Sequence, residues 1–217
     1  LDCNGIPDSC LTPTGACCIN VVEGCDLYRT CLPDLTETEC TDEGGTFFLG
    51  EACEQIACGA VQWQTEDGGN GHWYRVETTS ENTSWSDALI DSQSVNGYLA
   101  TLTSSEENDW AHELTRASIP GWTAYGPWIG GFQDLNAGDY TEPGGAWTWV
   151  TGEPWSFTAW NTIEPNNGYG GVEHWLQITA HTFNTTWNDA PNDMPDGVFS
   201  YIIEWDADCN GDGIVDY

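Results

Sequence analysis

Lysine is absent from this chain, and arginine occurs at only three positions, Arg29, Arg75 and Arg116. Against these cations stand 35 acidic residues, which give the 217-residue chain a formal net charge of −32. Because phosphate recognition requires clustered lysine and arginine, nucleic acid is excluded as a partner, and so is an anionic membrane surface. A chain of this charge repels itself when unscreened, so we expect it to work in salt or with bound cations.

Long apolar runs are missing as well. No stretch approaches the roughly 18 apolar residues of a membrane-spanning helix, so no membrane insertion is expected. Disorder is excluded by the aromatic content, because 13 Trp, eight Tyr and six Phe supply material for a large core. No signal-peptide pattern precedes Leu1, which indicates a mature chain or an excised fragment.

Cysteine is missing from residues 59 to 208, although the chain contains ten. Nine lie between Cys3 and Cys58, and the tenth is Cys209. Such cysteine content favours an oxidising, secreted or cell-surface setting. The uneven distribution predicts a short disulfide module followed by a long cysteine-free domain. Zinc is the alternative for the module, but the lack of nearby histidine favours disulfides.

The parity of the cysteines suggests how the two parts are joined. If Cys3 and Cys10 pair locally, seven cysteines remain in residues 13–58, which is an odd number. Cys209 makes the number even. We therefore expect a bridge from Cys209 to the module, with Cys58 as the favoured partner; the alternative is that Cys209 pairs outside this chain.

The module at residues 13–58 combines turn residues and cysteines with little apolar periodicity. A segment this small buries little core, so its bridges are expected to hold it together. Adjacent Cys17 and Cys18 are expected to serve different partners, because neighbouring residues rarely bridge each other. The predicted organisation is 1–12, a truncated calcium loop; 13–58, the disulfide module; 59–205, the main domain; and 206–217, a second truncated calcium loop.

Both ends of the chain fit parts of a calcium loop. The C-terminal run "DADCNGDGIVDY" matches the start of the pattern D-x-[DN]-x-[DN]-G, in which alternate oxygens meet on one cation. The N-terminal run "LDCNGIPDSC" fits positions 3 to 9 of the same loop. These runs resemble the calcium repeats of thrombospondin type-3 and dockerin modules; polar, frayed tails are the alternative. The expected ligands are Asp208, Asn210, Asp212, Ile214 through its carbonyl, Asp216, Asp2, Asn4 and Asp8.

The main domain begins with two helix signals and continues with strand signals. Residues 83–95 have Ser84 as an N-cap with Asp87 three residues later, and residues 104–117 have Ser104 and Glu107 as a capping pair. Short aromatic and β-branched runs follow, separated by long stretches rich in Gly, Pro, Asn and Asp. The fold class is therefore predicted as α+β. The tryptophans from 147 to 160 are interpreted as core, with a sugar-stacking platform as the alternative.

Four motifs in order, "WIGG" (128–131), "EPN" (164–166), "WND" (187–189) and "YIIEW" (201–205), resemble a C-type lectin-like domain over about residues 60 to 205. The resemblance implies that the first strand pairs with the last and that the WIG strand lies in the core. Pairing of these strands would bring the ends of the domain together, which also supports the Cys58–Cys209 bridge. The resemblance further implies a cis bond before Pro165 and a Ca²⁺ ion held by the EPN loop and the WND strand. Carried over by position, the residues for calcium and sugar are Glu164, Asn166, Glu173, Asn188 and Asp189, with the Asp189 carbonyl as a further donor.

The sequence departs from the family pattern at several positions. Trp175 stands where a cysteine would follow Glu173, and the stretch after Asn188 lacks its partner cysteine. Aromatic packing is expected to replace these internal bridges. The segment from Asn166 to Glu173 is one residue longer than the family pattern.

Two functional hypotheses follow. The first is an extracellular, calcium-dependent adhesion module that binds carbohydrate; the Glu-Pro-Asn order resembles the subgroup that selects mannose-, glucose- or fucose-like diols. The second is a structural subunit of an extracellular filament or surface layer, with calcium loops and disulfides as joints and a vestigial sugar site. In this second hypothesis the partners are other copies of the chain or adjacent modules. No nucleophile motif such as G-x-S-x-G is present, so the chain is predicted not to be an enzyme.

Overall fold

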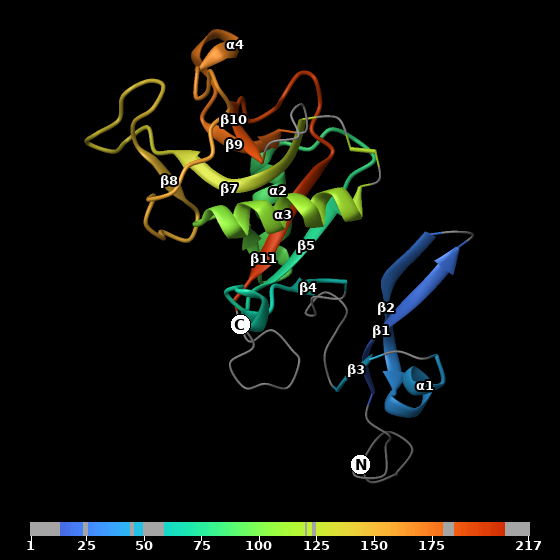
Figure 1. Ribbon diagram of the computed structural model, residues 1–217. Helices are drawn as coiled ribbons and strands as arrows, with labels where there is room; N and C mark the ends of the chain where they lie inside the picture. The colour runs from blue at the N-terminus through green and yellow to red at the C-terminus, as the bar shows by residue number, and fades with distance from the viewer. Residues whose placement is uncertain are drawn as a thin grey trace, which may run out of the picture. The chain divides into compact units, whose positions relative to one another are not determined.

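The computed structural model divides the chain into two units, with the larger one beginning at Val61 (Figure 1). The residues predicted to form terminal calcium loops lie outside the described residues. Cys3, Cys10, Cys58 and Cys209 lie outside them too, so the two proposed bridges stay predictions. The residues that the structure describes are 14–23, 26–43, 46–49, 59–119, 121–122, 125–179 and 185–206.

The N-terminal unit contains an antiparallel sheet with the strand order β2-β1-β3, together with one short helix. The apolar pattern did not predict this sheet, because cysteine, asparagine and glycine interrupt any alternation along the first strand. Its elements are β1 (Thr14–Glu23), β2 (Asp26–Thr36), α1 (Glu37–Asp42) and β3 (Thr46–Leu49).

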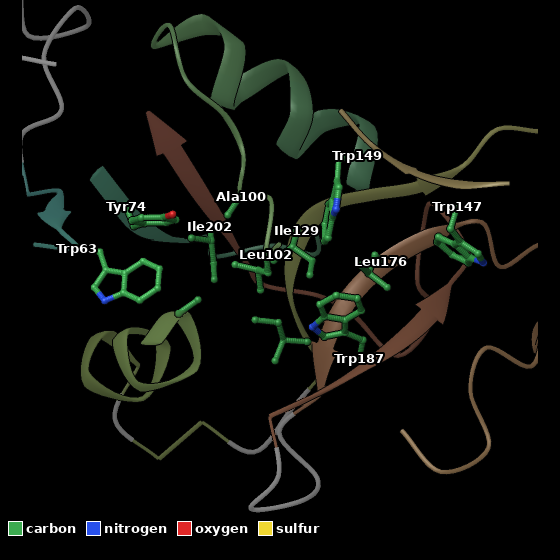
Figure 2. Packing of buried hydrophobic residues seen from close by; sticks show 12 residues of the cluster. Trp63, Tyr74, Ala100, Leu102, Ile129, Trp147, Trp149, Leu176, Trp187 and Ile202 are labelled. Carbon is green, nitrogen blue, oxygen red and sulfur yellow. The ribbon is translucent and has the colours of Figure 1, made fainter. Parts of the chain in front are cut away.

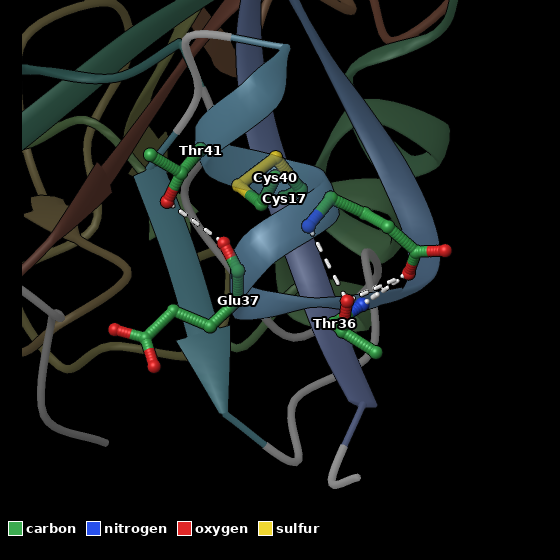
Figure 3. The surroundings of a disulfide bond; sticks show 6 residues. Cys17, Thr36, Glu37, Cys40 and Thr41 are labelled. Atoms are coloured by element: carbon green, nitrogen blue, oxygen red, sulfur yellow. Dashed lines mark hydrogen bonds between the residues drawn. A yellow bond between two sulfur atoms is a disulfide. The ribbon is translucent and has the colours of Figure 1, made fainter.

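A disulfide joins β1 to α1 in this unit. Cys17 bonds to Cys40, and both residues are completely buried (Figure 3). This bond agrees with the expectation of a disulfide module in which Cys17 does not pair with its neighbour. Thr36 caps the helix: its hydroxyl accepts from the Glu39 amide at 3.3 Å, and its own amide donates to the Glu39 carboxylate at 2.9 Å. The Cys17–Cys40 disulfide links residues 23 positions apart, and closing a loop of this length stabilises a fold by roughly 3 kcal/mol.

The larger unit is built on a sheet whose described strands follow the order β10-β9-β7-β11-β5-β4, with β6 added to β11 and β8 added to β7. The last strand, β11, pairs antiparallel with β5 over its whole length. The family resemblance implies pairing of the first and last strands; here the two-residue β4 comes first and pairs with β5, so the partner of β11 is the second strand of the unit. The strands are β4 (Val61–Gln62), β5 (Trp73–Thr78), β6 (Tyr98–Leu99), β7 (Tyr125–Gln133), β8 (Trp147–Trp149), β9 (Trp175–Thr179), β10 (Thr186–Ala190) and β11 (Ser200–Trp205).

Two helices begin where the sequence predicts them. α2 spans Trp85–Ser94 and α3 spans Ser105–Ser118, and the hydroxyls of Ser84 and Ser104 accept from the amides three residues later. A 3₁₀ turn (η3, Thr65–Asp67) and a short helix (α4, Gly168–Gly171) were not predicted. None of the helices in the described part of the chain is long and apolar enough to span a membrane.

One detail of the α3 cap differs from the prediction. The Glu107 carboxylate does not return to the N-cap amide of Ser104; it accepts from the amide and hydroxyl of Thr103 at 2.7 and 3.0 Å. Its other oxygen accepts from the Tyr74 hydroxyl at 2.5 Å. Glu107 therefore joins α3 to the sheet, because burial of the carboxylate requires several donors around it.

Tryptophans dominate the core between helices and sheet (Figure 2). Trp187 is completely buried and makes edge-to-face contacts with Trp149 and Phe157, with ring centroids 5.6 and 5.5 Å apart. Its indole nitrogen donates to Asn108 Oδ1 at 2.6 Å. The tryptophans from 147 to 160 pack against this centre, which confirms the core interpretation. The cluster consists of Trp63, Tyr74, Ala100, Leu102, Ala111, Ile129, Trp147, Trp149, Leu176, Ile178, Trp187 and Ile202.

The WIGG strand lies in this core, as the resemblance implies. Trp128 and Ile129 on β7 are completely buried. A Cβ at Gly130 would lie 2.3 Å from the Leu99 carbonyl oxygen, so only glycine allows the backbones of β6 and β7 to approach this closely.

Candidate functional site

The candidate site lies where the loop between β8 and β9 meets β10. Glu164 and Asn166 belong to that loop, and the peptide bond between Glu164 and Pro165 is cis. Glu173 precedes β9, whereas Asn188 and Asp189 lie on β10. In the β9–β10 register Trp175 faces Ala190, so Glu173 lies just past the end of β10. The fold thus brings the two sequence motifs to one edge, beside α4 (Figure 1).

The buried tryptophan of the WND motif fixes the register of the loop that carries Glu164. The Trp187 amide donates to the Ala159 carbonyl at 2.7 Å, and the Asn161 amide donates to the Trp187 carbonyl at 2.9 Å. The Glu164 amide then donates to the Asn161 carbonyl at 2.9 Å. The packing of the Trp187 ring in the core therefore positions both β10 and the loop that carries Glu164.

Asp189 forms a further contact between β10 and the loop. Its carboxylate accepts from the Asn166 amide at 3.0 and 3.1 Å, and from the Asn167 amide at 2.8 Å. The residue is completely buried. These charge-assisted bonds hold the loop against β10. The Asp189 carbonyl, which was expected to be a further cation ligand, accepts from the Asn188 side-chain amide.

Oxygen atoms from the loop converge around Gly168. A Cβ built on this residue would lie 2.9 Å from Asn166 Oδ1 and 2.9 Å from Glu173 Oε2. The Glu173 amide donates to Asn167 Oδ1 at 3.1 Å, and Glu173 is only 3% exposed. Gly168 therefore leaves room for a carboxylate and an amide oxygen to face the same small volume.

The electrostatics of the site are unfavourable for its carboxylates in the absence of a cation. Burial, reinforced by the neighbouring Asp189 carboxylate, raises the pKa of Glu164 and of Glu173 to about 7. The Oε2 atoms of both glutamates are buried, and neither has a hydrogen-bond partner among the residues that the structure describes. Unpartnered buried carboxylate oxygens are costly, and a bound cation would supply the missing partner.

The donor set fits calcium, which takes six to eight oxygen ligands, with carboxylates and amides among them. Glu164, Glu173 and Asp189 offer carboxylates, and Asn166 and Asn188 offer amide oxygens. As they stand, no group of three or more His, Cys, Asp or Glu side chains within the described residues is arranged to hold a metal ion. Full coordination by these residues therefore requires the amides, water or a ligand, and some movement of the side chains.

Sequence reasoning missed Asn167, Gly168, Tyr169 and Asp196, which shape the site. Asn167 accepts from the Glu173 amide, and Tyr169 donates its hydroxyl to Asp196 Oδ2. Asn167 and Tyr169 both have left-handed backbone conformations, with φ of 49° and 42°. The Asn- and Gly-rich run "NNGYGG" was the available signal, because Asn and Gly are the residues that enter this region most readily.

Comparison with known proteins assigns the chain to a family. No family model matches the chain. A perlucin-like protein of the mussel Mytilus galloprovincialis is 33% identical over 125 residues, which cover 54% of this chain and 71% of that protein. The C-type lectin lectoxin-Lio3 of Erythrolamprus poecilogyrus is 28% identical over 116 residues and is covered to 65% of its length. The chain belongs to the C-type lectin-like family.

A solved structure shows the same fold. The bovine C-type carbohydrate-recognition domain of CD23, determined in the presence of a GlcNAc2Man3 oligosaccharide, superposes with a TM-score of 0.52 at 22% identity. The superposition covers 69% of this chain and 95% of that domain. Members of the C-type lectin-like family are non-enzymatic carbohydrate-binding or structural proteins, which agrees with the prediction that the chain is not an enzyme.

Proposed function

We propose that the C-type lectin-like unit is an extracellular module that binds carbohydrate of the mannose type through calcium. The observation that carries this proposal is the pair of buried, unpartnered Oε2 atoms on Glu164 and Glu173, next to the buried Asp189 carboxylate. Three carboxylates crowded at one edge of the sheet are costly to keep ionised unless positive charge is bound near them. With only three arginines and no lysine in the chain, an external cation is the simplest source.

The residues that would hold the ion are Glu164, Asn166, Glu173, Asn188 and Asp189. A bound calcium ion supplies open coordination positions for two neighbouring hydroxyls of a sugar. The carboxylates of Glu164 and Glu173 would each accept a hydrogen bond from a hydroxyl. The amides of Asn166 and Asn188 would each donate one. Such acceptor–donor pairs discriminate between sugars by the direction of the two hydroxyl groups.

The expected specificity follows from the order of residues in the loop. Glu164 precedes Asn166 in the order Glu-Pro-Asn. This order resembles that of the family subgroup that selects the equatorial diols of mannose, glucose or fucose-like sugars. Disulfide bonding in the N-terminal unit and the lectin-type relatives support an extracellular location.

Calorimetric titration with calcium tests the site. Replacement Glu164→Ala removes one ligand charge and is expected to weaken calcium at this site on the order of tenfold or more, because ligand charge count sets calcium affinity. Glu113→Gln provides a control, since Glu113 is exposed on α3, away from the loop. Unchanged calcium affinity in Glu164→Ala would remove the site assignment. Calcium binding without mannose binding would instead favour a structural subunit.

A further inference from the structure

Tyr169 occupies an unusual backbone position inside the proposed calcium loop. Asn167, Tyr169, Gly170 and Gly171 all have positive φ, at 49°, 42°, 85° and 86°. Glycine enters this region freely and asparagine does so readily, but a bulky residue such as tyrosine does so only where its surroundings hold it. The loop therefore needs an external restraint at Tyr169.

The restraint is a hydrogen bond to the loop after β10. The Tyr169 hydroxyl donates to Asp196 Oδ2, while 49% of the tyrosine remains exposed. The Asp196 carboxylate also raises the pKa of Tyr169 to about 12, so the phenol keeps its proton and stays a donor. The loop at residues 164–173 thus contacts the segment that follows β10.

Asp196 belongs to a turn that is anchored to the start of α2. Asn82 donates to Asp193 Oδ1 at 2.9 Å and to the Met194 carbonyl at 3.2 Å, and it accepts from the Val198 amide at 2.7 Å. Met194 and Val198 are buried in the core. Because the residues on both sides of Asp196 are held in this way, its backbone has a defined position from which the side chain can bind Tyr169.

We infer that Tyr169 and Asp196 form a latch that positions the calcium loop of residues 164–173 against β10; this inference rests on the proposed calcium site. Within residues 164–173, the hydrogen bonds that the described residues make to β10 run through Asp189, whose carboxylate is itself an expected calcium ligand. A cation would compete with those amides for the same oxygens. The latch uses no ligand atom and can persist when calcium binds. No cysteine occurs between residues 59 and 208 to do this by a disulfide.

The latch is tested by Tyr169→Phe, Asp196→Ala and the double variant. Each single change removes one net hydrogen bond and is expected to weaken calcium binding roughly three- to tenfold. The double variant should lose no more than either single variant, because both remove the same bond. Amides between Asn166 and Glu173 should also exchange hydrogen faster in the calcium-free single variants, with an unchanged melting temperature.

Tyr98→Phe and Asp206→Ala are matched controls. Tyr98 donates to Asp206 Oδ1 at 2.8 Å, which is the same kind of bond at the opposite end of β11 from the Asp196 turn. These controls should leave calcium affinity and loop exchange unchanged.

The outcomes separate this inference from the proposed function. Absence of calcium binding in the wild-type protein overturns the proposed function, and the inference with it. Wild-type binding that Tyr169→Phe leaves unchanged, in affinity and in loop exchange, overturns the latch alone. Effects of the two single changes that add in the double variant overturn it as well, because they would show that the residues act separately.

Discussion

Gly168 lies between two of the expected calcium ligands of the candidate site. Its missing side chain leaves the space in which Asn166 Oδ1 and Glu173 Oε2 come together. The sequence alone predicted the five oxygen-bearing residues by their match to family motifs. It could not predict that a glycine between them sets the spacing, because that depends on the path of an irregular loop.

Replacement Gly168→Ala is expected to weaken calcium binding, because its Cβ would occupy the volume that Asn166 Oδ1 and Glu173 Oε2 face and would turn these two expected ligands away from it. The added Cβ would displace Asn166 or Glu173 by contact at 2.9 Å. Calorimetric titration measures the effect. Gly138→Ala is the control, since nothing lies within 4 Å of a Cβ there. Equal affinities for the two variants would contradict the described loop geometry.

At the scale of elements, the predictable parts were those with local signals. The helices α2 and α3 begin at serine caps that the sequence displays openly. The strands of the larger unit follow aromatic and β-branched runs. The sheet of the N-terminal unit was missed, because β1 has no alternation of apolar and polar residues. The helix α4 was missed, because its conformation depends on left-handed residues and tertiary contacts.

The N-cap of α3 gives a direct test of where this helix begins. Ser104→Ala removes the acceptor for the Glu107 amide at 3.1 Å and is expected to lower the free energy of unfolding by about 1 kcal/mol. Ser105→Ala changes an exposed serine one position later and should have little effect. Urea unfolding of both variants makes the comparison. A larger loss in Ser105→Ala would mean that the helix does not start as described.

At the scale of the whole molecule, the order of four short motifs predicted the fold better than any local pattern. The burial of Trp128 followed from that order, and so did the pairing of the last strand with a strand near the start of the unit, although that strand is β5 rather than β4. The acidic balance of the chain was also evident from composition. A network of buried polar groups was not evident, because it joins residues that are far apart in the sequence. Glu204 contacts His72 at 2.6 Å and also Tyr74, which are 132 and 130 positions away, and Tyr74 contacts Glu107 as well.

This network predicts how the stability of the calcium-free protein depends on pH. Burial raises the pKa of Glu204 to about 7, and the Glu204 carboxylate raises the pKa of His72. Both groups hold protons more tightly when folded, so their stabilising contribution is present at low pH and is lost as pH rises. We expect the free energy of unfolding to fall between pH 5 and 8, although burial lowers the pKa of His112 and therefore opposes part of this fall.

Urea unfolding at the two pH values, in the presence of a calcium chelator, measures this dependence. Glu164 and Glu173 contribute in the same direction, because their pKa values are also raised. The variant Glu204→Gln cannot titrate at this position and should show a smaller change. Stability that increases from pH 5 to pH 8 would contradict the description of Glu204 as a buried carboxyl group with a raised pKa.

The central claim is that the loop at residues 164–173 and β10 together hold calcium for a sugar. Titration of mannose into the wild-type protein with calcium, and again after chelation, tests it most directly. We expect mannose binding that disappears on chelation and is lost in Glu164→Ala but not in Glu113→Gln. Mannose binding that survives chelation, or that Glu164→Ala leaves intact, would contradict it.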